Sequence, residues 1–297
     1  MKTGLFDIDE VSYHADPCEV PSLSQSIATT LINRSPAHAY AEHPKLGGTA
    51  SRHSKTFDEG HAIHAMLLGK GADFVVVDAE DWRSKAAREK RDAAREQGKT
   101  PLLAQQHEDL VIAAAEFRKR LGEHEEHVEF GGHVEVVAMW VEMASDGTQV
   151  QCRGRLDHFD GTTIDDLKTS KNASPDKFAR SAYDYGYDIQ AAAYRSAIES
   201  IFPRIAGRVG YRLILCELAE PWPVAVARPT SEFFALGEAR WRRAVDAWAR
   251  CLKHNDWPAY NNGRTYALDP PGWAMARELE NQSQMPQWAL EAAGDAQ

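Results

Sequence analysis

The sequence has 297 residues, of which 34 are Lys or Arg and 44 are Asp or Glu, so its formal net charge is −10. This acidic balance excludes a protein that coats nucleic acid through bulk positive charge, although a local basic channel inside an acidic shell stays compatible with it. No apolar run approaches the roughly 20 residues that span a bilayer, and the N-terminal stretch lacks the apolar segment of a secretory signal.

The first 125 residues are predicted to be rich in helix. Ser22 or Ser24 can cap a helix that ends before Pro36, and another helical turn follows up to Pro44. The other elements predicted in this region are a short helix over 57–71, a strand over 73–78 and an amphipathic helix over 104–124.

The segment 81–99, DWRSKAAREKRDAAREQGK, carries seven basic and four acidic residues at helical spacing. One interpretation is a solvated helix crossed by ion pairs between residues four apart. The other is a basic arm that contacts phosphates of a nucleic acid. The sequence pattern is compatible with both interpretations.

From residue 126 onward, strands and helices alternate. Three strand-like runs are separated by the turn sequences SDGT and DGTT, which predicts an antiparallel meander. The predicted elements are strands over 133–144, 148–160 and 162–170, a long helix over 175–202, strands over 208–218 and 221–229, and a helix over 231–255. This order predicts an α/β core that follows a helical N-terminal region.

The stretch GRLDHFDGTTIDDLKTSK, residues 154–171, places acids and a lysine within strand-like sequence. Asp157 ends one predicted strand, while Asp166 and Lys168 share one face of the next because side chains alternate along a strand. A hairpin through the turn at 160–163 lets Asp157 approach Asp166. Two close carboxylates repel each other unless a cation lies between them, and oxygen ligands favour Mg²⁺ or Mn²⁺.

Such a set is typical of metal-assisted hydrolysis of a phosphodiester, in which a lysine orients or deprotonates the attacking water. The alternative is a surface hairpin with scattered charges, because two acids and a lysine at this spacing are a weak signal when taken alone. Residues elsewhere in the chain therefore have to separate the two interpretations.

Three further features fit a site on the strand pair. His64 follows His61 by three residues on the same side of a predicted helix, and the absence of an HExxH motif excludes a zinc protease. Glu135 lies in a strand that can pair with the one bearing the first aspartate. Gln190 and Tyr194 share one face of the next helix. Each feature also has a purely structural interpretation. The histidine can be held by a polar partner, the glutamate can belong to the polar face of a strand, and the residues of the helix can form an aromatic stripe against the core.

In chain order, the segments DEGHAIHAMLLG, GRLD, DDLKTS and YDYGYDIQAAAYR resemble the PD-(D/E)xK nuclease superfamily, and more narrowly the RecE-type exonuclease (exonuclease VIII) group of phage and prophage origin. The segments SLSQSIATTLINRSPAHAY, DWRSKAAREKRDAAREQGKTPLL and WPAY are also similar to that group, so the resemblance covers nearly the whole chain. Related nucleases that hold an iron–sulfur cluster need clustered cysteines, whereas the four cysteines here are far apart.

The resemblance implies a restriction-endonuclease-like α/β fold with a mixed central sheet, flanking helices and a helical N-terminal extension. We expect a single domain over 1–297, composed of a helix-rich N-terminal region (1–125), a catalytic core (126–260) and a C-terminal tail (261–297).

The resemblance also assigns residues to roles. For the metal, Mg²⁺ or Mn²⁺, they are His64, Glu135, Asp157, Asp166 and the Leu167 carbonyl, and for catalysis they are Asp157, Asp166, Lys168, Gln190 and Tyr194. Glu135 matches only an acid that some relatives place near the metal. The helix motif departs from the family pattern because Gly60 is followed by His61, so it stays open which histidine faces the metal, although His64 aligns better.

The activity that the resemblance implies is 5′→3′ exonuclease action on double-stranded DNA ends, which leaves a 3′ single strand for an annealing protein to use in recombination. One alternative is a structure-specific or sequence-specific endonuclease of the same fold. Another is a catalytically idle DNA-binding module, against which the intact set Asp157, Asp166 and Lys168 argues.

Relatives assemble subunits around the duplex, so we expect a homo-oligomer with a restricted basic channel. The candidates for contact with DNA are Arg83, Lys85 and Arg88 in the basic segment, with Arg34 and Ser35 near the terminal phosphate. We expect the protein to act in the cytoplasm of a bacterial or phage-infected host cell. We do not expect a membrane among its partners.

Overall fold

The computed structural model describes residues 2–48, 55–71 and 73–284. The chain forms two units, Met1–Ala259 and Tyr260–Gln297. The second unit contains the 3₁₀ turn η2 (Tyr260–Gly263) and the helix α10 (Gly272–Gln284). Within the described ranges, no helix combines the length and the apolar composition needed to cross a membrane.

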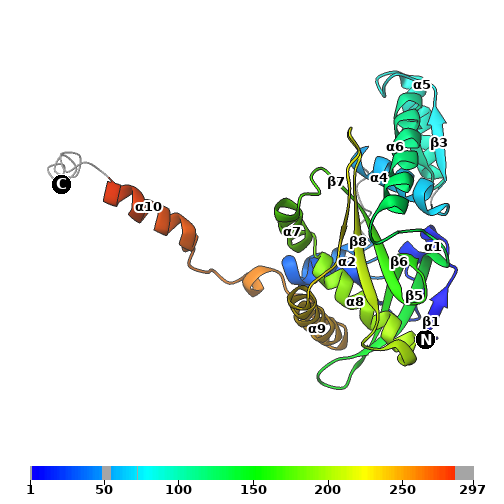
Figure 1. Ribbon diagram of the computed structural model, residues 1–297. Helices are drawn as coiled ribbons and strands as arrows, with labels where there is room; N and C mark the ends of the chain where they lie inside the picture. The colour runs from blue at the N-terminus through cyan, green and yellow to red at the C-terminus, as the bar shows by residue number, and fades with distance from the viewer. Residues whose placement is uncertain (1, 49–54, 72, 285–297) are drawn as a thin grey trace. The chain divides into compact units, whose positions relative to one another are not determined.

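A seven-stranded mixed sheet is the centre of the first unit (Figure 1). Its order is β1 (Gly4–Phe6), β5 (His133–Met143), β6 (Gln149–Phe159), β7 (Thr163–Ser170), β8 (Gly210–Glu217) and β9 (Val224–Ala227), with β2 (Leu23–Ser24) beside β6. All neighbours are antiparallel except β7 with β8 and β2 with β6. The sheet is therefore mixed and mostly antiparallel, and the meander β5–β6–β7 is confirmed.

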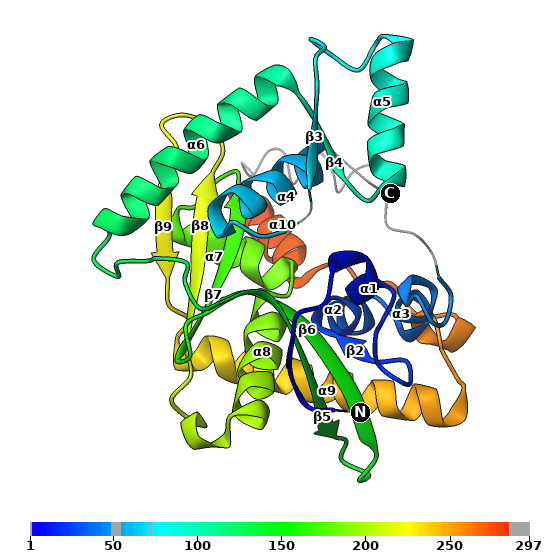
Figure 2. The ribbon, with the colours of Figure 1, turned by 90° about the vertical axis from the view of Figure 1, so that its right-hand side faces the viewer.

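Helices cover both faces of this sheet (Figure 2). Strand alternation on β7 and β8 separates the two faces. Ile164 and Leu213 pack with one core, and Leu167 and Ile214 pack with the other. The first core is completed by α2 (Gln25–Asn33), α3 (Pro36–Glu42), α7 (Pro175–Asp184), α8 (Tyr187–Ile201) and α9 (Ser231–His254), and the second by α4 (Lys55–Leu68) and α6 (Ala104–Glu123).

A small two-stranded parallel sheet lies against α4 and α6. It consists of β3 (Phe74–Val77) and β4 (Thr100–Leu103), and the basic helix α5 (Lys85–Glu96) connects them. The Ser84 side chain accepts from the Ala87 N–H and caps α5. The remaining elements of the first unit are α1 (Glu10–His14) and the 3₁₀ turn η1 (Pro203–Ile205).

The long helix predicted over 175–202 is wrong in one respect, because it breaks into α7 and α8 at Gly186. Gly186 has φ +74°, in the left-handed region that ends a right-handed helix. A Cβ there would lie 2.5 Å from Thr29 Oγ1 on α2, so this glycine also permits close packing. The break directs Tyr187 and the rest of α8 toward the sheet.

Two further differences concern the ends of the chain. Residues 1–125 also contribute β1 and β2 to the main sheet, and neither strand was predicted. The tail contains a regular helix, α10, and its residues from 285 on lie outside the described ranges. Short strands such as β1 and β2 leave no periodic pattern in the sequence, which is why the prediction missed them.

The close crossing of α8 and α9 yields a stability prediction. A Cβ on Gly237 of α9 would overlap the carbonyl oxygen of Asp188 on α8, and backbone atoms cannot move aside without separating the helices. We expect Gly237→Ala to lower the free energy of unfolding by about 1–3 kcal/mol, as overpacking does. Urea denaturation followed by circular dichroism measures it.

Gly122 of α6 offers the matched control, because a Cβ there meets nothing within 4 Å. Gly122→Ala should stabilise by up to about 1 kcal/mol through helix propensity alone. Equal effects of the two substitutions would contradict the close packing of α8 on α9.

Candidate active site

The candidate site begins where β6 and β7 separate. These strands are paired only at His158 with Asp165 and at Phe159 with Ile164. Beyond these pairs the strands diverge, and Asp157 and Asp166 are the first residues past the last pair. Asp157 Oδ2 accepts a 2.7 Å hydrogen bond from the backbone N–H of Leu167. The two acids thus lie at the mouth of a fork between the strands.

Glu135 on β5 lies in register with Asp157, but the ladder between β5 and β6 skips this pair. Glu135 has φ +49°, which is rare for a residue with a side chain. Leu156 and Phe159 belong to the same core although they are three residues apart, so the alternation of β6 is interrupted between them. Backbone strain of this kind is typical of functional sites and here reorients both acids.

His64 approaches the same point from α4. Its Nδ1 lies 3.9 Å from Asp157 Oδ2, and one ligand atom each from His64, Glu135 and Asp157 lie within 4.8 Å of one another. The helix is fixed by Ile63, which is fully buried in the core that contains Leu167. His61 is exposed and is not a member of this group of three.

Asp166 is engaged by two side chains. Its Oδ1 accepts a 2.6 Å hydrogen bond from Gln190 Nε2, and its Oδ2 lies 2.5 Å from Lys168 Nζ. The ammonium of Lys168 also lies 4.8 Å from the ring centroid of Tyr187, in a cation–π contact. Asp166 and Lys168 do share a face of β7, as the alternation of the strand predicts.

Burial raises the pKa of the acids in the fork. It raises the pKa of Glu135 to about 8, with the nearby charge of Asp157 acting in the same direction. Burial likewise raises the pKa of Asp166 to about 6, although Lys168 opposes the shift, and it raises the pKa of Asp157. Three acids with raised pKa values at one place are typical of a functional site.

The two basic side chains respond in opposite ways. Burial lowers the pKa of the His64 imidazole to about 3, and the positive charge of Lys168 adds to this, so the ring is neutral and can offer a lone pair. Burial also works against the charge of Lys168, but Asp166 and Asp157 outweigh it and raise the pKa of the ammonium. Lys168 is therefore a charged donor near neutral pH.

The donor set fits a divalent cation. His64, Glu135 and Asp157 supply one imidazole nitrogen and two carboxylates within reach of one ion, and Asp166 lies next to them across the fork. Hard cations such as Mg²⁺ and Mn²⁺ prefer such oxygen-rich ligands, and Mn²⁺ also accepts imidazole. A bound cation would stabilise the ionised carboxylates and so oppose the effect of burial on their pKa values.

Gln190 and Tyr194 occupy different surroundings. Gln190 contacts Asp166 directly, whereas Tyr194 is 3% exposed and lies in the core against β6. A Cβ on Gly154 would come within 2.6 Å of Tyr194 Cε1, which explains the glycine of the GRLD segment. Tyr194 thus supports the strand that bears Asp157, and the structure places its ring against the sheet.

The residues that we expected to contact DNA make contacts with their neighbours in the sequence. Arg34 pairs with Glu42 at 2.7 Å, and the Ser35 hydroxyl caps α3 and lies 2.6 Å from His38 Nδ1. The side chains of Arg83 and Lys85, at the start of α5, are 93% and 86% exposed.

Arg88, on the first turns of α5, donates to the carbonyl of Arg83. The exposure of Arg83 and Lys85 is compatible with a solvated helix and with a basic arm. The contact of these residues with DNA therefore stays a prediction.

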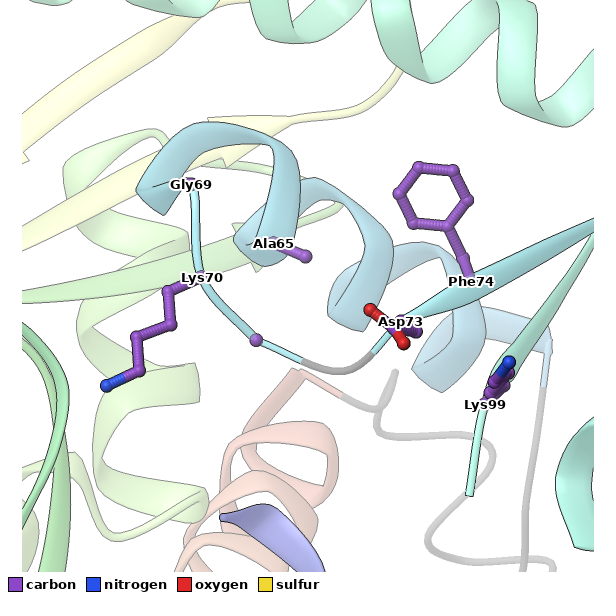
Figure 3. Close-up of a pocket in the computed structure, with 7 residues that line it drawn as sticks. Ala65, Gly69, Lys70, Asp73, Phe74 and Lys99 are labelled. Carbon is purple, nitrogen blue, oxygen red and sulfur yellow. The ribbon is translucent and has the colours of Figure 1, made fainter. Parts of the chain in front are cut away.

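A cavity of about 320 Å³ lies beside the C-terminal end of α4, outside the fork (Figure 3). Lys70 and Lys99 extend on opposite sides of it and do not converge on one point. Its lining residues are Ala65, Gly69, Lys70, Gly71, Asp73, Phe74 and Lys99. None of them is an acid of the fork, so this cavity does not mark the chemistry.

Sequence reasoning missed Arg155. Its Nε lies 2.7 Å from Glu135 Oε2, and its Nη1 lies 3.1 Å from Glu10 Oε2 on α1. Arg155 precedes Asp157 by two residues on the same strand, so its place in the sequence could have drawn attention to it. Glu10 carried no such signal, because its contact with the sheet spans more than a hundred residues of chain.

Comparisons with known proteins agree with this geometry. The sequence model of the family described as "PDDEXK-like domain of unknown function (DUF3799)" matches residues 24–267. No curated protein matches the sequence. A crystal structure described as "Putative exonuclease" from Eubacterium rectale is similar in fold, with a TM-score of 0.57 and 14% identity, over 90% of this chain and 96% of that one.

A phage related exonuclease from Haemophilus somnus 129PT is matched more distantly, with a TM-score of 0.32 and 12% identity, over 82% of this chain and 99% of that one. Its low score carries no weight for the fold. The match of the family over most of the chain, together with the fork of acids and lysine between β6 and β7, leads to one conclusion: the chain belongs to the DUF3799 family of PDDEXK-like domains.

Proposed function

We propose that this protein is a divalent-metal-dependent DNA exonuclease that degrades one strand 5′→3′ from double-stranded ends. The observation that carries the nuclease assignment is the buried fork, where Asp157, Asp166 and Glu135 meet His64 and Lys168. PDDEXK-like nucleases use divalent metal ions, and the donor set fits such an ion. The exonuclease and its polarity rest on the resemblance of the sequence to RecE-type enzymes.

In this mechanism, His64, Glu135, Asp157 and Asp166 would hold the cation, and the Leu167 carbonyl would be a further ligand. A bound divalent cation supplies Lewis-acid polarisation of the phosphate and lowers the pKa of water. Lys168 lies beside Asp166 with its charge retained, so it can orient the attacking water and donate to a phosphate oxygen.

The residues around this set keep it rigid. Gln190 holds one oxygen of Asp166 through its amide, which fixes the orientation of the carboxylate. Tyr194 acts one layer further away, through its packing against Gly154 on β6. The site can therefore depend on both residues although neither of them touches the phosphate.

The product of this reaction is a 3′ single strand that an annealing protein uses for recombination. Because the chain is acidic, its hold on DNA has to come from a restricted basic surface in a homo-oligomer. Arg83, Lys85 and Arg88 are our candidates for that surface, and Arg34 and Ser35 for the terminal phosphate. These assignments rest on the resemblance and on the exposure of the start of α5.

The first prediction concerns cleavage itself. With Mg²⁺, the protein should degrade end-labelled linear duplex and leave a covalently closed circle intact. Asp166→Asn should reduce the rate by roughly 100-fold or more, because several kcal/mol of transition-state stabilisation depend on the cation. Asp184→Asn is the matched control, since Asp184 is 61% exposed at the end of α7.

Cleavage of the closed circle would instead identify an endonuclease of the same fold. Cation binding without cleavage of either substrate would identify the idle DNA-binding module. Unaltered cleavage by Asp166→Asn would remove the fork from the mechanism.

A second prediction separates Lys168 from the metal ligands. Lys168→Ala should lose turnover on linear duplex while it binds Mn²⁺ at least as tightly as the wild type, because it removes a positive charge 2.5 Å from Asp166. Isothermal titration calorimetry beside a cleavage assay measures both quantities. A parallel loss of Mn²⁺ affinity and turnover would contradict the role given to Lys168.

The third prediction is a pH dependence of metal binding. The raised pKa values of Glu135 (about 8) and Asp166 (about 6) mean that a cation has to displace protons at neutral pH. The affinity for Mn²⁺ should therefore rise from pH 6 to pH 8. Calorimetry at pH 7 in two buffers with different ionisation enthalpies should reveal proton release, and Glu135→Gln should diminish it.

A binding heat that is independent of the buffer would show that both carboxyl groups are already ionised in the free protein. An affinity that falls as the pH rises would contradict their role as ligands. Either result would overturn the electrostatic description of the fork.

A further inference from the structure

Two arginines on one face of β6 hold the N-terminal segment against the sheet. The guanidinium carbon of Arg153 lies 5.6 Å from the ring centroid of Tyr13, and Arg155 Nη1 lies 3.1 Å from Glu10 Oε2. Both contacts are made by residues of α1. This segment precedes residue 24, where the family match begins. The helix α1 therefore lies outside the matched residues.

Arg155 is shared between two carboxylates. Its side chain is 16% exposed, and it reaches Glu10 on one side and Glu135 on the other. The contact with Glu135 is close, at 2.7 Å, yet the Nε of Arg155 has no hydrogen-bond partner with acceptable geometry. The Glu135 carboxyl group is thus in contact with the guanidinium, but no directed hydrogen bond from the Arg155 Nε locks it in place.

We propose that α1 completes the active site, with Glu10 and Arg155 as positioning residues for Glu135. Glu10 draws the guanidinium partly toward itself and so leaves Glu135 able to turn to a divalent cation beside Asp157. This inference rests on the proposed function, because it concerns the cation of the same fork.

The physical reason is the geometry of arginine. A guanidinium that faces a single carboxylate forms two parallel hydrogen bonds with it, and this bidentate pair would compete with a cation for Glu135. The guanidinium of Arg155 is shared between Glu10 and Glu135, and it makes one contact with each of them. The loss of Glu10 also removes a negative charge near the fork, so both effects weaken the binding of a cation.

The backbone of Glu135 gives independent support. Its positive φ and the missing ladder pair with Asp157 show that the chain accepts strain to present this side chain. A surface ion pair would not require such strain. The pair Lys70–Asp7, in which Asp7 belongs to the same N-terminal segment, illustrates the ordinary case, since the Asp7 side chain is 83% exposed.

The test uses the full-length protein and Mn²⁺ as the probe. Glu10→Gln should raise the Kd for Mn²⁺ in calorimetry by about 10-fold, the size typical of a lost partner of a metal ligand. In the cleavage assay, the Mn²⁺ concentration for half-maximal rate should rise by a similar factor. Glu116→Gln is the matched control, because Glu116 is 28% exposed and pairs with Arg120 as Glu10 does with Arg155.

A double-mutant cycle shows whether Glu10 acts through Arg155. In the Arg155→Gln background, Glu10→Gln should have a clearly smaller effect on Mn²⁺ affinity than in the wild type, because the guanidinium that it draws away is gone and only the lost negative charge acts. Additive effects of the two substitutions would overturn the proposal. So would a Kd for Glu10→Gln within two-fold of the wild type, even if its unfolding midpoint in EDTA falls, since the pair would then be structural only.

The outcomes also separate this inference from the proposed function. If Glu10→Gln weakens Mn²⁺ binding but the wild type cleaves no DNA, the nuclease assignment fails and the positioning role stands. If the wild type cleaves linear duplex and Glu10→Gln binds Mn²⁺ normally, the nuclease assignment stands and the positioning role fails. A wild type that binds no Mn²⁺ would overturn both.

Discussion

Carboxylates that are buried side by side repel each other, and this repulsion is the constraint around which the fork between β6 and β7 is organised. Burial disfavours the ionised form of each carboxyl group and raises the pKa of Glu135, Asp157 and Asp166, and the nearby charge of Asp157 acts in the same direction on the other two acids. Lys168 and Arg155 balance part of the charge, while His64 stays neutral. A divalent cation would interact favourably with all of these carboxylates.

The fold holds this cluster of acids in place by packing rigid helices around an irregular part of the sheet. The divergence of β6 from β7 opens the space, and the unpaired position at Glu135 and Asp157 turns two acids toward it. Helices on both faces then fix the surrounding side chains. The glycines at 186 and 237 allow α8 to pack closely on α2 and α9, so that Gln190 on α8 reaches Asp166. A small shift of α8 would therefore be transmitted to a proposed metal ligand.

Much of this arrangement could be predicted from local patterns. Alternation along β7 placed Asp166 and Lys168 on one face, and the turn sequences at 145–148 and 160–163 predicted the meander. The serine caps and apolar stripes predicted α2, α4 and α6. These features depend on neighbours in the sequence, which is why a pattern reveals them.

The rest depended on contacts between distant segments of the chain. The break at Gly186 serves the packing against Thr29, and the sequence of a continuous helix does not reveal it. The interrupted alternation at Asp157 and the contact of Glu10 with Arg155 likewise arise from the assembled sheet. The roles of His64, Gln190 and Tyr194 came from the resemblance. In the structure, His64 is close to Glu135 and Asp157, Gln190 contacts Asp166, and Tyr194 packs in the core.

The central claim is that the fork binds a divalent cation through His64, Glu135 and Asp157. Crystals grown with Mn²⁺ and measured at its absorption edge test this claim most directly, because anomalous scattering locates the ion without reference to activity. The account predicts a strong anomalous peak in contact with these three side chains, with Asp166 beside it. A peak elsewhere on the protein, or no peak while the three side chains keep their present positions, would contradict it.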